Sequence, residues 1–131
     1  NAVTICKNAL SQGGKLRGIL WHQGEGDSGK PETANTYAPR LLDMFTTLRK
    51  ELDAHNVPIV AGELGHYLID YPNLPYFQTV NQQLHQLETL LPQYALATAQ
   101  DLTVNEDGLH IDAKGLREFG KRYFEKYLTL L

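Results

Sequence analysis

The sequence predicts an α/β domain built around a parallel β-sheet. Apolar residues at helical spacing alternate along the chain with short, continuous apolar runs, in the order α-β-α-β-α-β-α. Such runs are too short for helices and are typical of strands that are buried on both faces. Helices between successive strands favour parallel pairing, and right-handed crossovers then give an open, doubly wound sheet.

The first half of the chain predicts two helices and two strands. Apolar spacing predicts a helix over 2–11, which the paired glycines at 13–14 end. The run 17–21 predicts a buried strand. Helical spacing returns over 34–54, and the apolar run 58–62 predicts the next strand.

The second half repeats this alternation. Inward-facing apolar residues predict a helix over 76–91, which Pro92 stops, and the run 94–98 predicts the third strand. A last helix opens at Asp112, whose carboxylate can cap the amino end of that helix. Three strands are few for such a sheet. Its edges are therefore expected to be open unless further strands precede Asn1 or another chain supplies them.

Composition narrows the function class. A chain of 131 residues that is 42% hydrophobic and 21% charged is expected to form one globular domain. A net charge of −3 without a basic run predicts no nucleic-acid partner, and no apolar run is long enough to predict a membrane span. Cys6 is the only cysteine, so no intrachain disulfide and no thiol cluster for zinc is expected. The sequence indicates no particular compartment.

Three polar loops mark where chemistry is expected. In open parallel sheets, ligands bind beyond the carboxyl ends of the strands. This rule selects the loops 22–30, 63–75 and 99–111, because each follows a predicted strand. We therefore expect these loops to line one crevice.

Asp107 and His110 in the last loop have the spacing of a catalytic pair. They lie three residues apart in an Asp-Gly-Leu-His turn before a helix. At that spacing the carboxylate can accept a hydrogen bond from the imidazole Nδ1–H, which leaves Nε2 to take a proton from a hydroxyl. The same residues also fit a solvated turn, because Asp-Gly is common in turns.

The first loop supplies an amide and two carboxylates. Gln23, Glu25 and Asp27 follow a buried strand and are separated by Gly24 and Gly26, which allow close approach of the backbone to a ligand. The Gln23 amide can donate a hydrogen bond to a developing oxyanion, and Glu25 can orient a histidine or bind a sugar hydroxyl. The alternative is a polar surface loop whose carboxylates cap the next helix.

The second loop carries further polar side chains. Glu63 and His66 follow the second strand and are expected to face the crevice as substrate contacts, with a buried and paired Glu63 as the alternative. His85 lies between polar residues in the middle of a helix and is expected to be solvated. Three nearby tyrosines fit either a sugar-stacking wall or a packed loop: Tyr67, Tyr71 and Tyr76.

A metal site is a rival interpretation of the same loops. His22 with Glu25 and Asp107 with His110 could supply two halves of a ligand set. Such a site needs three or four convergent ligands with supporting partners, and spacing alone does not establish convergence.

Four segments of the chain resemble one family of esterases. Gly18–Asp27 resembles the Trp-His-Gln-Gly-Glu-Ser-Asp block of the sialate O-acetylesterase and acetylxylan esterase group, which is carbohydrate esterase family six within the SGNH hydrolases. Asp107–His110 resembles the last block of that family, and Ile59–Gly65 and Phe119–Tyr123 are similar to its intervening segments. The resemblance covers nearly the whole chain in the right order.

This resemblance implies a three-layer α/β/α, flavodoxin-like sheet, of which the chain holds the last three of five strands. It also implies metal-independent removal of acetyl groups from carbohydrate hydroxyls, without a cofactor. His110 is then the general base, Asp107 its orienting carboxylate, and Gln23 part of the oxyanion and acyl-binding region, with Glu25 as an alternative triad acid. The residues expected to bind the acetylated carbohydrate are His22, Asp27, Glu63 and His66.

The chain lacks parts of the family pattern that an active esterase needs. Gly26 stands where the family has serine, and the blocks with the nucleophilic serine and the oxyanion-hole glycine have no match. The two serines of the chain, Ser11 and Ser28, have no nucleophile context. We therefore expect residues 1–131 to be the C-terminal part of one esterase domain, inactive without the missing N-terminal half or another chain. The alternatives are a non-catalytic carbohydrate-binding or scaffold domain and a metal-dependent hydrolase.

Overall fold

The structure, a computed structural model, describes all residues from Asn1 to Leu131. None of its helices has the length and apolar character needed to cross a membrane. Its elements, in chain order, are α1 (Ala2–Ser11), β1 (Ile19–Trp21), the 3₁₀ turn η1 (Glu25–Asp27), α2 (Pro31–Asn35), α3 (Tyr37–Glu51), β2 (Ile59–Gly62), the 3₁₀ turn η2 (His66–Asp70), α4 (Phe77–Leu90), β3 (Tyr94–Ala97) and α5 (Ala113–Thr129).

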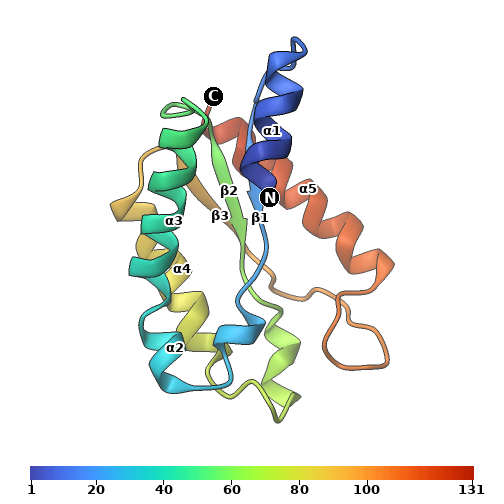
Figure 1. The fold of residues 1–131 in the computed structure, drawn as a ribbon. Helices are drawn as coiled ribbons and strands as arrows, with labels where there is room; N and C mark the ends of the chain where they lie inside the picture. The colour runs from blue at the N-terminus through green and yellow to red at the C-terminus, as the bar shows by residue number, and fades with distance from the viewer.

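The three strands form one parallel sheet in the order β1-β2-β3 (Figure 1). Ile19 pairs with Ile59, which in turn pairs with Tyr94. β2 and β3 are buried along their whole length, whereas β1 is partly exposed, although β1 and β3 both lie at edges of the sheet. The predicted parallel α/β sheet is confirmed.

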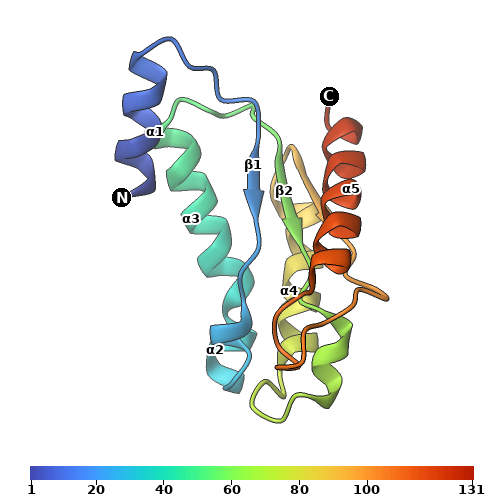
Figure 2. The ribbon, with the colours of Figure 1, turned by 90° about the vertical axis from the view of Figure 1, so that its right-hand side faces the viewer.

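Helices cover the two faces of this sheet unequally. α2, α3 and α4 lie on one side and α5 on the other, as two perpendicular views show (Figures 1 and 2). The core on the α3 and α4 side contains 16 buried residues, and one of them, Phe45, packs edge-on against the partly buried Trp21. The core on the α5 side contains only 6 buried residues, among them Val60 and Phe119. The α5 side is therefore the thinner layer.

The helix predicted over 34–54 is two helices. α2 ends at Asn35 and α3 begins at Tyr37, with Thr36 between them. Pro39 explains the break, because proline lacks the N–H that a helix interior requires and is tolerated only in the first turn. Its place as the third residue of α3 puts that missing donor where the helix has no acceptor for it.

The last helix begins as the sequence predicts. Asp112 is its N-cap, and the Asp112 carboxylate accepts a 2.7 Å hydrogen bond from the Gly115 N–H. The same carboxylate also accepts from the Thr103 hydroxyl at 2.6 Å, which ties the start of α5 to the loop before it. This cap fixes where the 99–111 loop must end, and the Asp-Gly-Leu-His turn lies immediately before it.

Candidate active site

The three polar loops meet at one end of the sheet. Because all strands are parallel, the segments after β1, β2 and β3 leave from the same edge, which is the lower end in both ribbon views (Figures 1 and 2). This is where ligands bind in open parallel sheets. Side-chain geometry in these loops therefore decides what the chain can do.

Asp107 and His110 form a hydrogen-bonded pair. The His110 Nδ1 lies 2.6 Å from Asp107 Oδ2, and Asp107 Oδ1 accepts from the backbone N–H groups of Leu109 and His110, each at 2.9 Å. The hydrogen bond from the His110 ring, followed by those two backbone N–H groups, lowers the pKa of Asp107 to about 2. The carboxylate is thus ionised across the physiological range and holds Nδ1 as the donor, which leaves Nε2 as the free acceptor.

The backbone of the turn is built to hold this pair. Gly108 adopts a positive φ of 70°, which an L side chain adopts only with strain, and its N–H donates to Asn105 O at 2.9 Å. The Asn105 N–H donates to His110 O at 2.8 Å, which closes the loop on itself. The side chains of His110 and Asp107 are 72% and 48% exposed, so the pair lies on an open surface of this chain.

Gln23 and Asp27 belong to a second network, on the α3 side of β1. The Gln23 Nε2 donates to Asp27 Oδ2 at 2.9 Å, and the Tyr37 hydroxyl donates to both the backbone and the side-chain carbonyl of Gln23. Arg40 forms an ion pair with Asp27. Partial burial works against the Asp27 carboxylate, but hydrogen bonds from Gln23 and Arg40 outweigh it and lower the Asp27 pKa. The Gln23 amide is thereby fixed, with one N–H left over.

Gly24 has a packing role that the sequence does not reveal. Its φ is +146°, and a Cβ there would lie 2.8 Å from Val80 Cγ1 and 3.4 Å from a Leu64 methyl. A Cβ on Gly26 would meet nothing within 4 Å. From the sequence, both glycines are expected to leave room for a ligand. In the structure, the space beside Gly24 is instead filled by the Val80 and Leu64 side chains of the protein core.

The charges of two carboxylates, Glu25 and Asp107, act on the hydroxyl of Tyr67. Burial first, then the charges of these two carboxylates, raise the pKa of Tyr67 to about 12. Glu25 itself is half-buried and makes no side-chain hydrogen bond. A tyrosine from the loop after β2 therefore feels the charge of both the loop after β1 and the loop after β3, and it bonds to the latter through Leu109 O.

Glu63 is a buried carboxylate at the end of β2, only 6% exposed. His85 Nε2 lies 2.7 Å from Glu63 Oε1, and Oε2 accepts from the His66 ring at 3.0 Å, the Thr98 hydroxyl at 2.8 Å and the Ala99 N–H at 2.9 Å. The expectation that His85 is solvated is therefore incomplete, because one edge of its ring bonds to Glu63. The partner lies 22 residues away on another element, which local sequence cannot show.

Acid should weaken the fold through this group. Burial raises the pKa of Glu63, but hydrogen bonds from Ala99, His85, Thr98 and His66 outweigh burial, so its pKa lies below the ordinary value of 4.5. A lowered pKa in the folded state stabilises the fold above the ordinary value, and this contribution is lost as pH falls through the lowered value.

We expect Glu63→Gln to lower the free energy of unfolding by about 1–3 kcal/mol at pH 7, and by less at pH 3. Urea unfolding at the two pH values measures both differences. Glu88→Gln is the control, because Glu88 contacts the same His85 at 3.3 Å from an exposed position. We expect it to cost less than about 1 kcal/mol. Equal losses at pH 7 and pH 3 for Glu63→Gln would contradict the ionised state assigned to Glu63.

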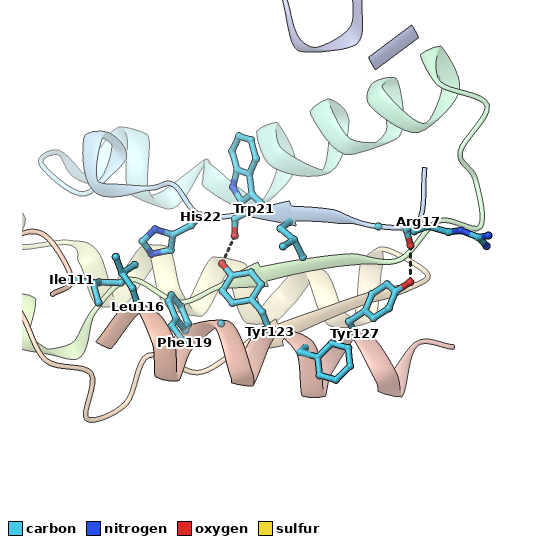
Figure 3. Close-up of a pocket in the computed structure, with 12 residues that line it drawn as sticks. Arg17, Trp21, His22, Ile111, Leu116, Phe119, Tyr123 and Tyr127 are labelled. Atoms are coloured by element: carbon cyan, nitrogen blue, oxygen red, sulfur yellow. Dashed lines mark hydrogen bonds between the residues drawn. The ribbon is translucent and has the colours of Figure 1, made fainter. Parts of the chain in front are cut away.

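His22 lies on the α5 side of β1, in an apolar groove of about 530 Å³ (Figure 3). Its ring packs edge-on against Phe119, with the ring centroids 5.5 Å apart. The Tyr123 hydroxyl donates to Trp21 O at 2.6 Å and the Tyr127 hydroxyl to Arg17 O at 3.0 Å, which holds β1 against α5. His22 and Gln23 thus leave β1 toward opposite faces of the sheet.

Neither serine of the chain is placed as a nucleophile. Ser11 is the last residue of α1 and its hydroxyl donates to Asn8 O. Ser28 is completely buried and donates to Gly24 O at 2.8 Å. No three His, Cys, Asp or Glu side chains are grouped so as to hold a metal ion, so the rival metal interpretation gains no ligand set from the geometry.

The sequence matches the model of a known family over residues 1–129, described as "Carbohydrate esterase, sialic acid-specific acetylesterase". The chain belongs to this family. Its resemblance to carbohydrate esterases is therefore confirmed at the level of the family.

Relatives of this acetylesterase-family chain are longer than the chain itself. A probable carbohydrate esterase of Arabidopsis thaliana is 24% identical over 117 residues, which are 89% of this chain and 42% of that protein. An X-ray structure of an Arabidopsis thaliana protein superposes with a TM-score of 0.84 at 23% identity, over 97% of this chain and 50% of that one. The chain thus spans about half the length of these relatives, and the superposition supports the same fold.

Sequence reasoning missed several residues that hold the site of this family member. Tyr37 and Arg40 hold Gln23 and Asp27 from the first turn of α3. The sequence singles out Tyr67 as a stacking or packing residue, but not its hydrogen bond from η2 to Leu109 O in the Asp-Gly-Leu-His turn. The sequence shows that these side chains are polar and lie in elements next to the loops. It does not show which groups they bond to, because each contact depends on how separate elements pack.

Proposed function

We propose that this chain forms the acid–base part of a carbohydrate esterase that removes O-acetyl groups from sugars or polysaccharides. The observation that carries the proposal is the Asp107–His110 pair, in which His110 Nδ1 lies 2.6 Å from Asp107 Oδ2 and Nε2 of His110 has no hydrogen-bond partner. A histidine fixed in this tautomer at the ligand-binding edge of a parallel sheet is suited to activate a hydroxyl nucleophile.

In the proposed reaction, a serine hydroxyl from outside this chain attacks the acetyl carbonyl carbon. His110 Nε2 takes the serine proton as the carbon–oxygen bond forms, and the carbonyl oxygen becomes an oxyanion. His110 then gives that proton to the departing sugar oxygen, which leaves an acetyl-serine. Water, deprotonated by His110, attacks the acetyl carbon. The bond from that carbon to the serine oxygen then breaks, His110 returns the proton to the serine oxygen, and acetate leaves.

The fixed amide of Gln23 supports an oxyanion role. One N–H is bound to Asp27, and the other is free to donate to the oxyanion, alongside backbone N–H groups from outside the chain. A donor that is already held in place needs little reorganisation when negative charge develops. Arg40 and Tyr37 contribute by holding this network.

The triad acid is proposed to be Asp107, with Glu25 as the alternative. Asp107 already contacts the His110 ring, whereas the Glu25 carboxylate makes no hydrogen bond in this chain. Among the residues proposed to bind the sugar, His22 and His66 have exposed rings, while Asp27 and Glu63 are engaged with neighbouring side chains. The two carboxylates would then act by orienting groups that touch the sugar.

The rest of the active site is proposed to dock at the open edge of β1. Ile19 N–H donates to Pro58 O, so in a parallel ladder the alternate residue Leu20 directs its backbone groups away from β2. The Leu20, Leu116 and Phe124 side chains beside this edge are 66%, 57% and 60% exposed. An unpaired edge next to a thin apolar layer suits an added strand from the missing half of the protein.

The test is esterase activity in the complete protein and in its separated halves. We expect the complete protein to release acetate from acetylated xylan or O-acetylated sialic acid, and the 131-residue chain alone to release none. Mixing the chain with its upstream half should restore activity. A complete protein that binds these sugars without hydrolysing them would favour the non-catalytic alternative.

Leu20→Asp locates the interface in the same experiment. A charge beside the β1 edge should weaken association of the halves by about 10-fold or more, measured by titration of activity. Leu90→Asp is the matched control, because Leu90 is 54% exposed at the end of α4 and away from the groove. Equal effects of the two substitutions would contradict docking at β1.

A further inference from the structure

We propose that Tyr67 is a positioning residue for the Asp107–His110 pair, so that the loop after β2 sets the geometry of the catalytic turn after β3. The inference rests on the proposed esterase function and assigns a role to a side chain that touches neither the substrate nor the reacting atoms. It follows from a set of contacts that clamp the 99–111 loop at both of its ends.

The first contact is inside the catalytic turn. The Tyr67 hydroxyl donates to Leu109 O at 2.9 Å, and the Leu109 N–H donates to Asp107 Oδ1, also at 2.9 Å. Leu109 is therefore held on one side by Tyr67 and on the other by the carboxylate that orients His110. Because Leu109 lies between Asp107 and His110 in the chain, movement of Leu109 changes the position of both residues.

The second contact is at the start of the same loop. Glu63, four residues before Tyr67, accepts hydrogen bonds from the Thr98 hydroxyl and the Ala99 N–H. The Glu63 N–H also donates to Ala97 O at 3.0 Å. The segment after β2 thus bonds to the 99–111 loop at two places: where that loop leaves β3, and where that loop forms the Asp-Gly-Leu-His turn.

Tyr67 is itself fixed in direction. Asn81 on α4 binds both the N–H and the C=O of Leu64, at 2.8 Å and 3.0 Å, which anchors the backbone before η2. A Cβ on Gly65 would lie 2.2 Å from the Tyr67 ring, so the ring folds back over a position that only glycine leaves open. The half-buried ring also packs against both hydrophobic cores.

The charge state of Tyr67 suits this role. Burial and the neighbouring carboxylates raise its pKa to about 12, so the hydroxyl keeps its proton at neutral pH and can donate to Leu109 O. A phenolate in the same place would repel that carbonyl. The charges of Glu25 and Asp107, the two candidates for the triad acid, both act on this hydroxyl.

Tyr67→Phe tests the proposal with two kinds of measurement. In the complete protein, we expect kcat to fall about 10-fold while KM changes by less than about 2-fold, because only the alignment of the base is lost. In the 131-residue chain, NMR should show a smaller share of the Nδ1–H tautomer of His110. Amide exchange at Leu109 and His110 should become about 5- to 10-fold faster.

Tyr94→Phe is the matched control. The Tyr94 hydroxyl also donates to a backbone carbonyl, that of Leu84 at 3.1 Å, but Tyr94 starts β3 at the opposite end of the sheet. We expect it to leave kcat and the His110 tautomer unchanged. Gly65→Ala is a second variant that displaces the Tyr67 ring without removing its hydroxyl, and it should reproduce the lower kcat.

The outcomes separate this inference from the proposed function. If His110→Ala leaves the complete protein fully active, the esterase mechanism fails and the role of Tyr67 fails with it. If His110→Ala is inactive but Tyr67→Phe keeps the kcat and His110 tautomer of the unaltered protein, the esterase mechanism stands and the positioning role is wrong. An equal loss in Tyr94→Phe would also overturn it, because the effect would then follow from general destabilisation.

Discussion

His110→Ala should lower kcat/KM of the complete protein for the proposed ester hydrolysis by about 1,000- to 10,000-fold, the largest functional effect expected of any single substitution in this chain. The reason is that His110 moves the proton in both halves of the proposed reaction. Its side chain is 72% exposed, so its removal should leave the fold intact, which circular dichroism can confirm. Hydrolysis of p-nitrophenyl acetate measures the loss. Retention of more than about a tenth of the activity would contradict His110 as the base.

The same assay decides between the two candidate triad acids. Asp107→Asn removes the charge that holds the Nδ1–H tautomer, and we expect a loss of about 100-fold or more. Glu25→Gln should lower kcat/KM by less than about 10-fold if Glu25 acts only through its charge. The reverse order would assign the triad acid to Glu25. Both substitutions conserve side-chain shape, so the comparison reports on charge and hydrogen bonding.

Gly24→Ala should lower the free energy of unfolding by about 2–5 kcal/mol, the largest stability effect expected in the site loops. Two costs add up: a positive φ of 146° that strains an L residue, at about 1–3 kcal/mol, and a Cβ only 2.8 Å from Val80 Cγ1, at a similar cost. Urea unfolding followed by circular dichroism measures the change. The loop that carries Gln23 and Glu25 should shift in the same variant.

Gly26→Ala is the control for that measurement. Gly26 lies two residues away in the same loop, has no positive φ, and a Cβ there would meet no atom within 4 Å. We expect a change within about 0.5 kcal/mol, as is usual for surface substitutions. Similar losses for both glycines would show that the loop resists any side chain. The packing of Gly24 against Val80 and Leu64 would then not be the cause.

The fold was predictable from local patterns because the three strands are short apolar runs between amphipathic helices. The Asp107–His110 pair was predictable for the same reason, since both residues belong to one turn and their spacing sets their distance. The Asp112 cap is another local feature that the structure confirms. Interactions between residues a few positions apart can be predicted from the sequence, because the spacing along the chain limits the distance between them.

The features that could not be predicted join residues far apart in the chain. His85 bonds to Glu63 across 22 positions, and Tyr67 bonds to Leu109 O across 42. The contact that a Cβ on Gly24 would make depends on where α4 places Val80. Each of these follows from how helices and loops pack, which a pattern of polar and apolar residues does not specify.

The two tyrosine bonds that hold β1 have a consequence for how the domain is made. Tyr123 and Tyr127 donate to the carbonyls of Trp21 and Arg17, which lie 102 and 110 positions earlier in the chain. At roughly 5–20 residues per second, a ribosome that has finished β1 needs about 5–20 s more to produce these partners. During that interval the nascent strand lacks one of its supports. The seam between β1 and α5 is therefore completed only about a hundred residues after β1 itself, and premature termination before Tyr123 would deliver a sheet without it.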